Sequence, residues 1–119
     1  MSRLNSPMDL HGLTLSNRIA MAPLTRCRAG QGDVPQPISA LYYAQRASAG
    51  LIITEATNVT PKSCAFEKAP GIYSDAQVAG WKVITEAVHK AGGHLFMQLW
   101  HCGRSEERRV GKECLRLCR

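Results

Sequence analysis

Three apolar segments, separated by two stretches of helical pattern, constrain the fold of this chain more than any other feature. They cover residues 18–22, 51–56 and 94–100. The second is rich in β-branched residues and does not alternate apolar with polar residues, as expected of a parallel strand covered on both faces. The pattern predicts the order β-α-β-α-β, with right-handed crossovers in a parallel sheet.

The two helices are predicted from proline, capping and glycine signals. The first can begin at Pro35 or Pro37, since proline is tolerated in a first turn, and closes at Gly50. The second begins at a capping box, Ser74 to Gln77, and ends at Gly92-Gly93. Residues at helical spacing in the first helix are Ile38, Leu41, Tyr42 and Gln45, and the second carries an apolar stripe of Val78, Trp81, Ile84 and Val88. Residues 10–15 predict a short hairpin or irregular entry segment.

The fold class is therefore α/β, and two architectures compete for it: a doubly wound sheet and a TIM (β/α)8 barrel. The doubly wound nucleotide fold places a glycine-rich turn after its first strand. Here residues 23–27 read Pro-Leu-Thr-Arg-Cys and contain no glycine. The barrel is favoured, and the chain supplies its first three βα units. A whole barrel takes about 250 residues, so we expect a truncated one.

Composition and charge exclude several classes of function. The 45% hydrophobic and 20% charged content is that of an ordinary soluble protein. No apolar run nears ~20 residues and no secretory signal precedes the fold, so we expect a cytoplasmic protein without membrane association. The net charge of +6 raises the question of a nucleic-acid partner. Five of the fifteen basic residues lie in 105–119 and no basic stripe forms elsewhere, which argues against one.

The five cysteines include no C-x-x-C pair, and an odd number argues against a disulfide framework. Free thiols are expected. His101, Cys114 and Cys118 are residue types that bind zinc, but their spacing does not favour a zinc site. No metal site is predicted.

Chemistry-bearing residues follow each predicted strand: residues 22–26 (APLTR), 54–57 (TEAT) and 98–104 (QLWHCGR). Carboxyl ends of parallel strands are where barrel enzymes build active sites. Together with residues 17–19 (NRI) and 69–73 (APGIY), these motifs resemble the old yellow enzyme family of FMN-dependent ene-reductases, the NADH:flavin oxidoreductases. The resemblance covers about residues 4–104, with several motifs in order at matching spacing.

The resemblance implies a cofactor site for FMN. Pro23, Leu24 and Thr25 are expected along the flavin, with the Thr25 hydroxyl bonding O4 of the ring. Ala56 is small where the ring approaches the backbone closely, although a plain core alanine is the alternative. Gln98 is expected to pair its amide with the pyrimidine edge, because an amide both donates and accepts. A glutamine within an apolar strand is also costly to bury unpaired, which independently suggests a ligand.

Phe66 and Trp100 are expected to shape the substrate pocket, although a tryptophan is more often a core residue. No catalytic residue is expected within this segment, because in the family the substrate-anchoring His/Asn or His/His pair and the tyrosine proton donor come from a later strand. The implied activity is reduction of activated alkenes, such as enones and enals, with NAD(P)H. The alternative function is a small basic binding module without catalysis. Oligomeric state is not predicted.

Residues 105–119 do not continue the pattern. They are more than half charged, show no amphipathic face and contain Gly111. A basic arm is one interpretation; translated adaptor sequence foreign to the family is the favoured one. We therefore divide the chain into 1–104, the N-terminal part of an FMN-binding barrel, and 105–119, a non-family tail. We expect the 119-residue chain by itself to be inactive.

Overall fold

The computed structural model describes residues 3–63 and 66–103. Residues 105–119, which include Cys114 and Cys118 of the possible zinc site, therefore lie outside the described part. A short antiparallel hairpin, β1 (Met8–Leu10) and β2 (Leu13–Leu15), leads into the fold. His11 and Gly12 form its turn, and both have positive φ angles, of 48° and 89°. This confirms the predicted hairpin.

Three parallel strands form the central sheet in the order β3 (Ala20–Met21), β4 (Leu51–Ile53) and β6 (Leu95–Phe96). Two further strands, β5 (Thr57–Asn58) and β7 (Leu99–Trp100), pair in parallel with each other just beyond β4 and β6. The predicted second strand thus ends early, at Ile53, and the third is interrupted between Phe96 and Leu99. The reason is local: the Gln98 N–H donates to the Thr54 side-chain Oγ1 (3.1 Å). A side-chain oxygen takes the place of a ladder carbonyl there.

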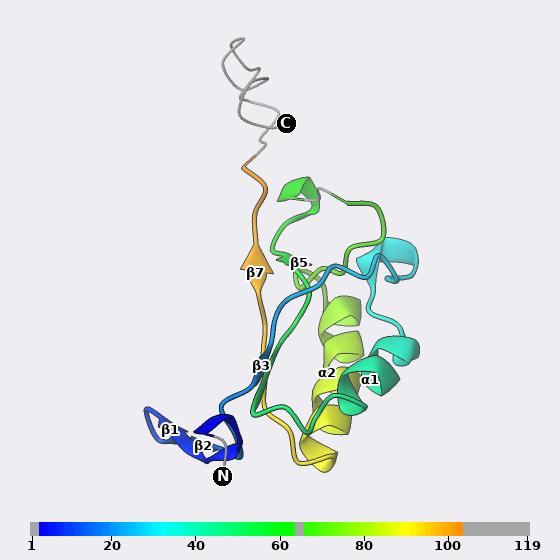
Figure 1. Ribbon diagram of the computed structural model, residues 1–119. Coiled ribbons are helices and arrows are strands. Elements are labelled where there is room, and N and C mark those ends of the chain that lie inside the picture. The colour runs from blue at the N-terminus through cyan, green and yellow to red at the C-terminus, as the bar shows by residue number, and fades with distance from the viewer. Residues whose placement is uncertain (1–2, 64–65, 104–119) are drawn as a thin grey trace.

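Both helices lie on one side of the sheet, as Figure 1 shows. They are α1 (Pro37–Ala44) and α2 (Asp75–Lys90), and short 3-10 turns at Arg3–Asn5, Gln31–Asp33 and Pro61–Ser63 complete the chain. Sequential strand order with both helices on one face is the arrangement of consecutive βα units in a (β/α)8 barrel. The predicted fold class is confirmed for its first three strands and two helices.

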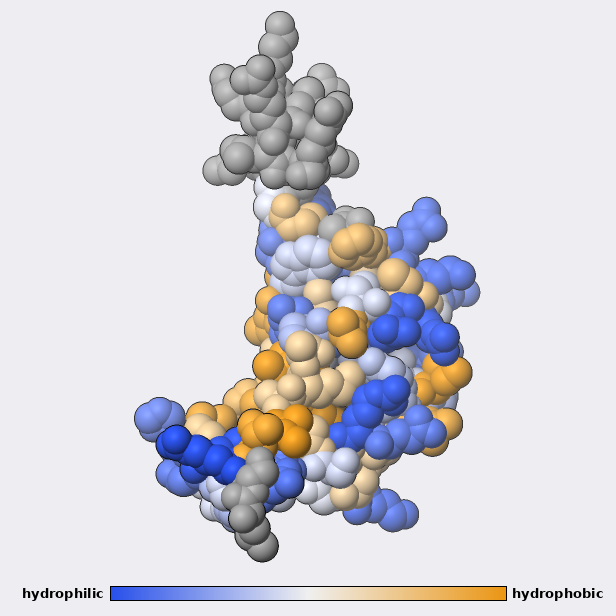
Figure 2. Space-filling model, viewed as in Figure 1, coloured by the Kyte–Doolittle hydropathy of each residue, from blue (hydrophilic) through white to orange (hydrophobic). Residues whose placement is uncertain are grey.

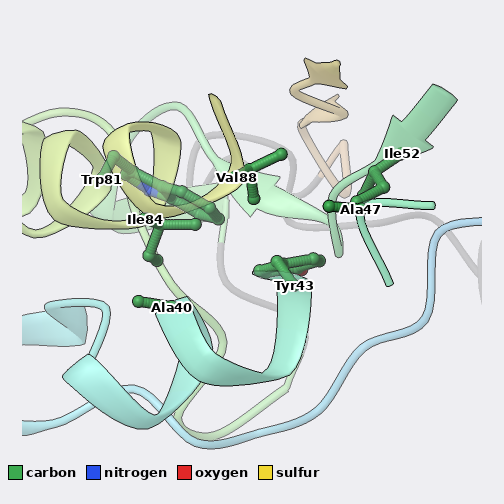
Figure 3. Packing of buried hydrophobic residues seen from close by; sticks show 7 residues of the cluster. All are labelled: Ala40, Tyr43, Ala47, Ile52, Trp81, Ile84 and Val88. Carbon is green, nitrogen blue, oxygen red and sulfur yellow. The ribbon is translucent and has the colours of Figure 1, made fainter. Parts of the chain in front are cut away.

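The core lies between the two helices and the sheet (Figure 3). Tyr43 of α1, Ile52 of β4 and Ile84 of α2 are at most 1% exposed. The cluster comprises Ala40, Tyr43, Ala47, Ile52, Trp81, Ile84 and Val88. Three of the four residues predicted for the α2 stripe are buried here, and the predicted capping box at Ser74 and Gln77 is present.

The buried face of α1 is not the one that its apolar spacing marks, although Tyr42 packs half-buried against the core. Ile38 and Leu41 are half or more exposed, while Ser39, Ala40 and Tyr43 are buried. The physical reason is Tyr43, whose hydroxyl accepts a hydrogen bond from the Glu55 backbone N–H (2.9 Å). This bond and the close packing of α1 on α2 fix the rotation of the helix. The helix also ends at Ala44, before Gly50.

Asn17 joins the entry to β3 to the entry to β4. Its Oδ1 accepts from the backbone N–H groups of Gly50 (2.8 Å) and Ile19 (3.0 Å), and its Nδ2 donates to the Ser48 carbonyl (2.8 Å). Any side chain at position 50 would collide with the Asn17 carbonyl. Gly50 is therefore required by close backbone approach, and not as the end of a helix.

Candidate functional site at the strand ends

The residues predicted to hold a cofactor all follow the carboxyl ends of neighbouring parallel strands. Pro23, Leu24 and Thr25 come directly after β3, Ala56 lies between β4 and β5, and Gln98 lies between β6 and β7. Because β3, β4 and β6 are adjacent in that order, these three segments share one edge of the sheet. Figure 1 shows the three strands running together toward this end of the molecule.

Backbone hydrogen bonds bring the Ala56 and Gln98 segments together. The Gln98 N–H donates to Thr54 Oγ1, and its carbonyl accepts from the Thr57 N–H (2.9 Å). Thr54 and Thr57 lie on either side of Ala56, which is 6% exposed. The Gln98 side chain itself is exposed. The cost of burying an unpaired amide therefore does not arise in this structure, and burial gives no independent reason for a ligand at Gln98.

The exposed polar groups at this edge are free to meet a ligand. Within residues 3–63 and 66–103, neither the Thr25 hydroxyl nor the side-chain amide of Gln98 forms a hydrogen bond. Pro23 and Thr25 are half-buried and Leu24 is 52% exposed. Together they offer one hydroxyl, one amide and an apolar side chain beside a small buried alanine.

Phe66 and Trp100, predicted to line a pocket, are brought into contact. Their ring centroids lie 5.7 Å apart and the ring planes are tilted by 42°. Trp100 belongs to β7 and Phe66 to the segment after the 3-10 turn at Pro61–Ser63. Phe66 is 48% exposed, so the pair forms a partly open aromatic surface and is not a buried core contact.

Two residues at this edge were not predicted to have a role. Glu55 is 3% exposed, and its Oε2 accepts a hydrogen bond from the backbone N–H of Arg26 (2.9 Å). The Tyr43 hydroxyl lies 3.5 Å from Glu55 Oε1. Burial raises the pKa of the Glu55 carboxyl, while the hydrogen bonds from Arg26 and Tyr43 oppose that rise. Burial also holds the pKa of Tyr43 far above its usual range, so its hydroxyl keeps its proton. In the sequence, the feature that could have singled out Glu55 is its position as the one carboxylate within the apolar, β-branched segment 51–56.

The described residues beyond β7 add no side chain to this group of strand ends. His101 Nδ1 accepts from the Gly103 N–H (2.9 Å), a local contact within an exposed loop. In the described ranges, no group of three or more His, Cys, Asp or Glu side chains is placed to hold a metal ion. Over the same residues, α2 and the shorter helices are too short or too polar to cross a membrane.

The comparisons with known proteins agree with this fold. Chanoclavine-I aldehyde reductase of Penicillium roqueforti is 50% identical over 106 residues, which are 87% of this chain and 29% of that protein. The old yellow enzyme homologue from Zymomonas mobilis superposes with a TM-score of 0.80 at 57% identity, covering 82% of this chain and 28% of its own.

Morphinone reductase in complex with tetrahydroNAD superposes with a TM-score of 0.82 at 52% identity, covering 87% of this chain and 28% of its own. The chain thus spans less than a third of the length of these relatives. The family model for the NADH:flavin oxidoreductase / NADH oxidase family matches residues 3–114, which extends into the segment set apart as a tail. The chain belongs to this family of flavin oxidoreductases, the old yellow enzymes.

Proposed function

We propose that this chain forms the flavin-ring site of an FMN-dependent oxidoreductase that reduces activated alkenes, such as enones and enals, with NAD(P)H. The observation that carries the proposal is the placement of Thr25, Ala56 and Gln98 at the ends of three adjacent parallel strands. Membership of a flavin oxidoreductase family supports it. So do relatives whose names describe an aldehyde reductase and a morphinone reductase crystallised with a nicotinamide analogue.

The residues at this edge fit a flavin ring. Such a ring presents an acceptor and a donor side by side, and the exposed Gln98 amide can answer both. The Thr25 hydroxyl would donate to a ring oxygen, while buried Ala56 leaves room for a flat ring close to the backbone. Pro23 and Leu24 would contact its apolar face.

Bound FMN supplies hydride chemistry that no protein side chain provides. The residues of this chain would bind the flavin ring and set its reduction potential. A hydroxyl donor from Thr25 would stabilise negative charge on the ring and so raise its reduction potential. Phe66 and Trp100 would form one wall of the alkene pocket, where their tilted rings exclude water from the reacting carbon. We also propose that residues 105–119 take no part in this site.

A chimeric barrel tests the proposal, because it supplies the two thirds of the relatives that this chain does not span. In it, residues 3–103 of this chain replace the corresponding segment of the Zymomonas mobilis homologue. We expect a yellow protein that retains FMN and oxidises NADPH with 2-cyclohexenone. The unmodified homologue is the positive control, and saturated cyclohexanone is the negative control substrate. A folded but colourless chimera, or one without alkene reduction, would contradict the proposal.

A further inference from the structure

The loop after β3 is held to the central strand by one buried carboxylate. Glu55 accepts a hydrogen bond from the Arg26 backbone N–H at 2.9 Å, across 29 residues of sequence. Arg26 directly follows Thr25, so this bond fixes the peptide unit next to the proposed flavin ligand. Glu55 in turn directly precedes Ala56. One side chain therefore links two of the three strand ends that make up the site.

The loop conformation needs such a support. Cys27 has a φ angle of 54°, in the left-handed region that residues with a Cβ adopt at a cost. A second contact comes from the side chain of Arg26, whose guanidinium carbon lies 5.5 Å from the centroid of the Tyr42 ring. Residues 25–27 are therefore held against α1 and β4 in a shape that the chain would not favour alone.

The carboxylate is itself held in place. The Tyr43 hydroxyl accepts from the Glu55 N–H at 2.9 Å and faces Oε1 at 3.5 Å. Tyr43 is fully buried in the core between α1 and α2. A buried carboxyl is costly unless it is hydrogen-bonded, so this arrangement needs a reason. A chain that only had to fill this space would do better with an apolar side chain.

We propose that Glu55 is a positioning residue for the flavin site: by holding the Arg26 amide, it fixes the backbone of Thr25 and so directs the Thr25 hydroxyl at the ring. This rests on the proposed function. Glu55 does not touch substrate or cofactor and acts through Thr25.

The experiment compares variants of the chimeric barrel. Glu55→Ala removes the acceptor, whereas Glu55→Gln keeps one oxygen that can accept from Arg26. We expect Glu55→Ala to slow flavin reduction by NADPH about tenfold and to lower the flavin potential, and Glu55→Gln to restore most of both. Ser74→Ala is the matched control, since the Ser74 hydroxyl caps α2 by accepting from the Gln77 N–H and does not contact Glu55, Tyr43 or Arg26. It should lower the melting temperature and leave rate and potential unchanged.

A readout without flavin separates the two proposals. Amide hydrogen exchange at Arg26 should become about tenfold faster in Glu55→Ala and stay slow in Ser74→Ala. If the unsubstituted chimera binds no FMN, the proposed function fails, and exchange at Arg26 still reports whether Glu55 holds the loop.

The positioning role is overturned if Glu55→Ala lowers only the melting temperature, with reduction rate and potential as in the unsubstituted chimera. Should Glu55→Ala not fold, Tyr43→Phe replaces it, because loss of the hydroxyl releases Glu55 without removing the ring. For Tyr43→Phe we then expect flavin reduction by NADPH to be slowed by less than the tenfold expected of Glu55→Ala. A Tyr43→Phe variant with unchanged rate and potential would equally overturn the role.

Discussion

Thr25 makes the most specific prediction at the scale of single residues. Replacing it with alanine in the chimeric barrel should lower the flavin potential by about 30–60 mV, because a hydrogen bond to a charged acceptor contributes about 1.5–3 kcal/mol. Reduction by NADPH should slow accordingly. Spectroelectrochemical titration and stopped-flow reduction measure the two quantities. Thr25→Ser, which keeps the hydroxyl, is the control and should behave as the unsubstituted chimera. Equal potentials for all three proteins would refute the contact.

Gln98 is expected to matter for holding the flavin and not for folding. Its side chain is exposed, while its backbone makes the bonds that join β5 to β7. Gln98→Leu should therefore weaken FMN binding about tenfold or more and leave the melting temperature of the apoprotein nearly unchanged. Titration of apoprotein with FMN measures the affinity. Unchanged affinity would argue against a role at the ring edge.

Glu55 should make stability depend on pH in a defined direction. Burial raises the pKa of its carboxyl in the folded state above the unfolded value. The folded protein then binds the proton more tightly, so the contribution of Glu55 to stability is complete below about pH 4.3. It is lost as the pH rises through the folded pKa. Urea unfolding of the chimeric barrel and its Glu55→Gln variant should show the variant gaining relative stability with rising pH. A constant difference between the two would contradict this.

The residues of the site were predictable to different degrees. The apolar pattern placed Thr25 just after the first predicted strand, and Ala56 and Gln98 near the ends of the second and third. Their expected contacts with a flavin came from the family resemblance and stay predictions. The contact of Glu55 with Arg26 was not predictable from the pattern, because Arg26 is 29 residues away and belongs to an irregular loop.

At the scale of elements, α2 depends on one buried amide. Gln77 Oε1 accepts from the N–H groups of Tyr73 (2.8 Å) and Ser74 (3.1 Å), while its Nε2 donates to the Gly32 carbonyl (2.9 Å). The same side chain caps the helix and anchors the 3-10 turn at Gln31–Asp33. Its loss would leave partners on two elements unpaired.

We therefore expect Gln77→Ala to cost about 2–3 kcal/mol of unfolding free energy in the chimeric barrel, since buried groups lose their partners. Ser74→Ala, which removes only one half of the capping box, should cost about 1 kcal/mol. Lys82→Ala, on the exposed face of α2, is the control and should change little. Urea denaturation measures all three. Equal costs for Gln77→Ala and Ser74→Ala would show that the link to Gly32 contributes nothing.

The elements themselves were largely predictable. Proline and capping signals located the starts of both helices and Gly92-Gly93 the end of α2, whereas Gly50 did not mark the end of α1. β-Branched content located β4. The rotation of α1 was not predictable from hydrophobicity, because its buried face carries Ser39 and Ala40 while Ile38 and Leu41 are exposed. Close packing against α2 favours small residues there, and a tertiary contact of Tyr43 decides the rest.

The whole molecule presents a large apolar surface. Figure 2 shows apolar residues gathered along the strand side, above the β1–β2 hairpin. Ile19, Leu24, Phe96 and Leu99 are between 47% and 64% exposed. Monomeric soluble proteins rarely expose contiguous apolar patches of more than a few hundred Å². The outer strands β3 and β6 also have one unpaired edge each within the described sheet.

We accordingly expect the isolated 119-residue polypeptide to self-associate, to bind no FMN and to leave NADPH unoxidised. Light scattering after size-exclusion chromatography and the visible absorption spectrum test this together. Replacing Phe96 and Leu99 with lysine should shift the polypeptide toward smaller species if the strand side drives association. A monomer with a cooperative melt and a flavin band would contradict the prediction.

Asn17 bears on the order in which the chain acquires structure during synthesis. Each of its partners, Ile19, Ser48 and Gly50, is present once residue 50 has been added, before any residue of α2 has been made. Translation proceeds from the N-terminus, so the first crossover can close early. The core around Tyr43 and Ile52 is completed only after Ile84 of α2 has been synthesised. In that interval the apolar side chains of the first crossover lack the cover that α2 provides in the folded chain.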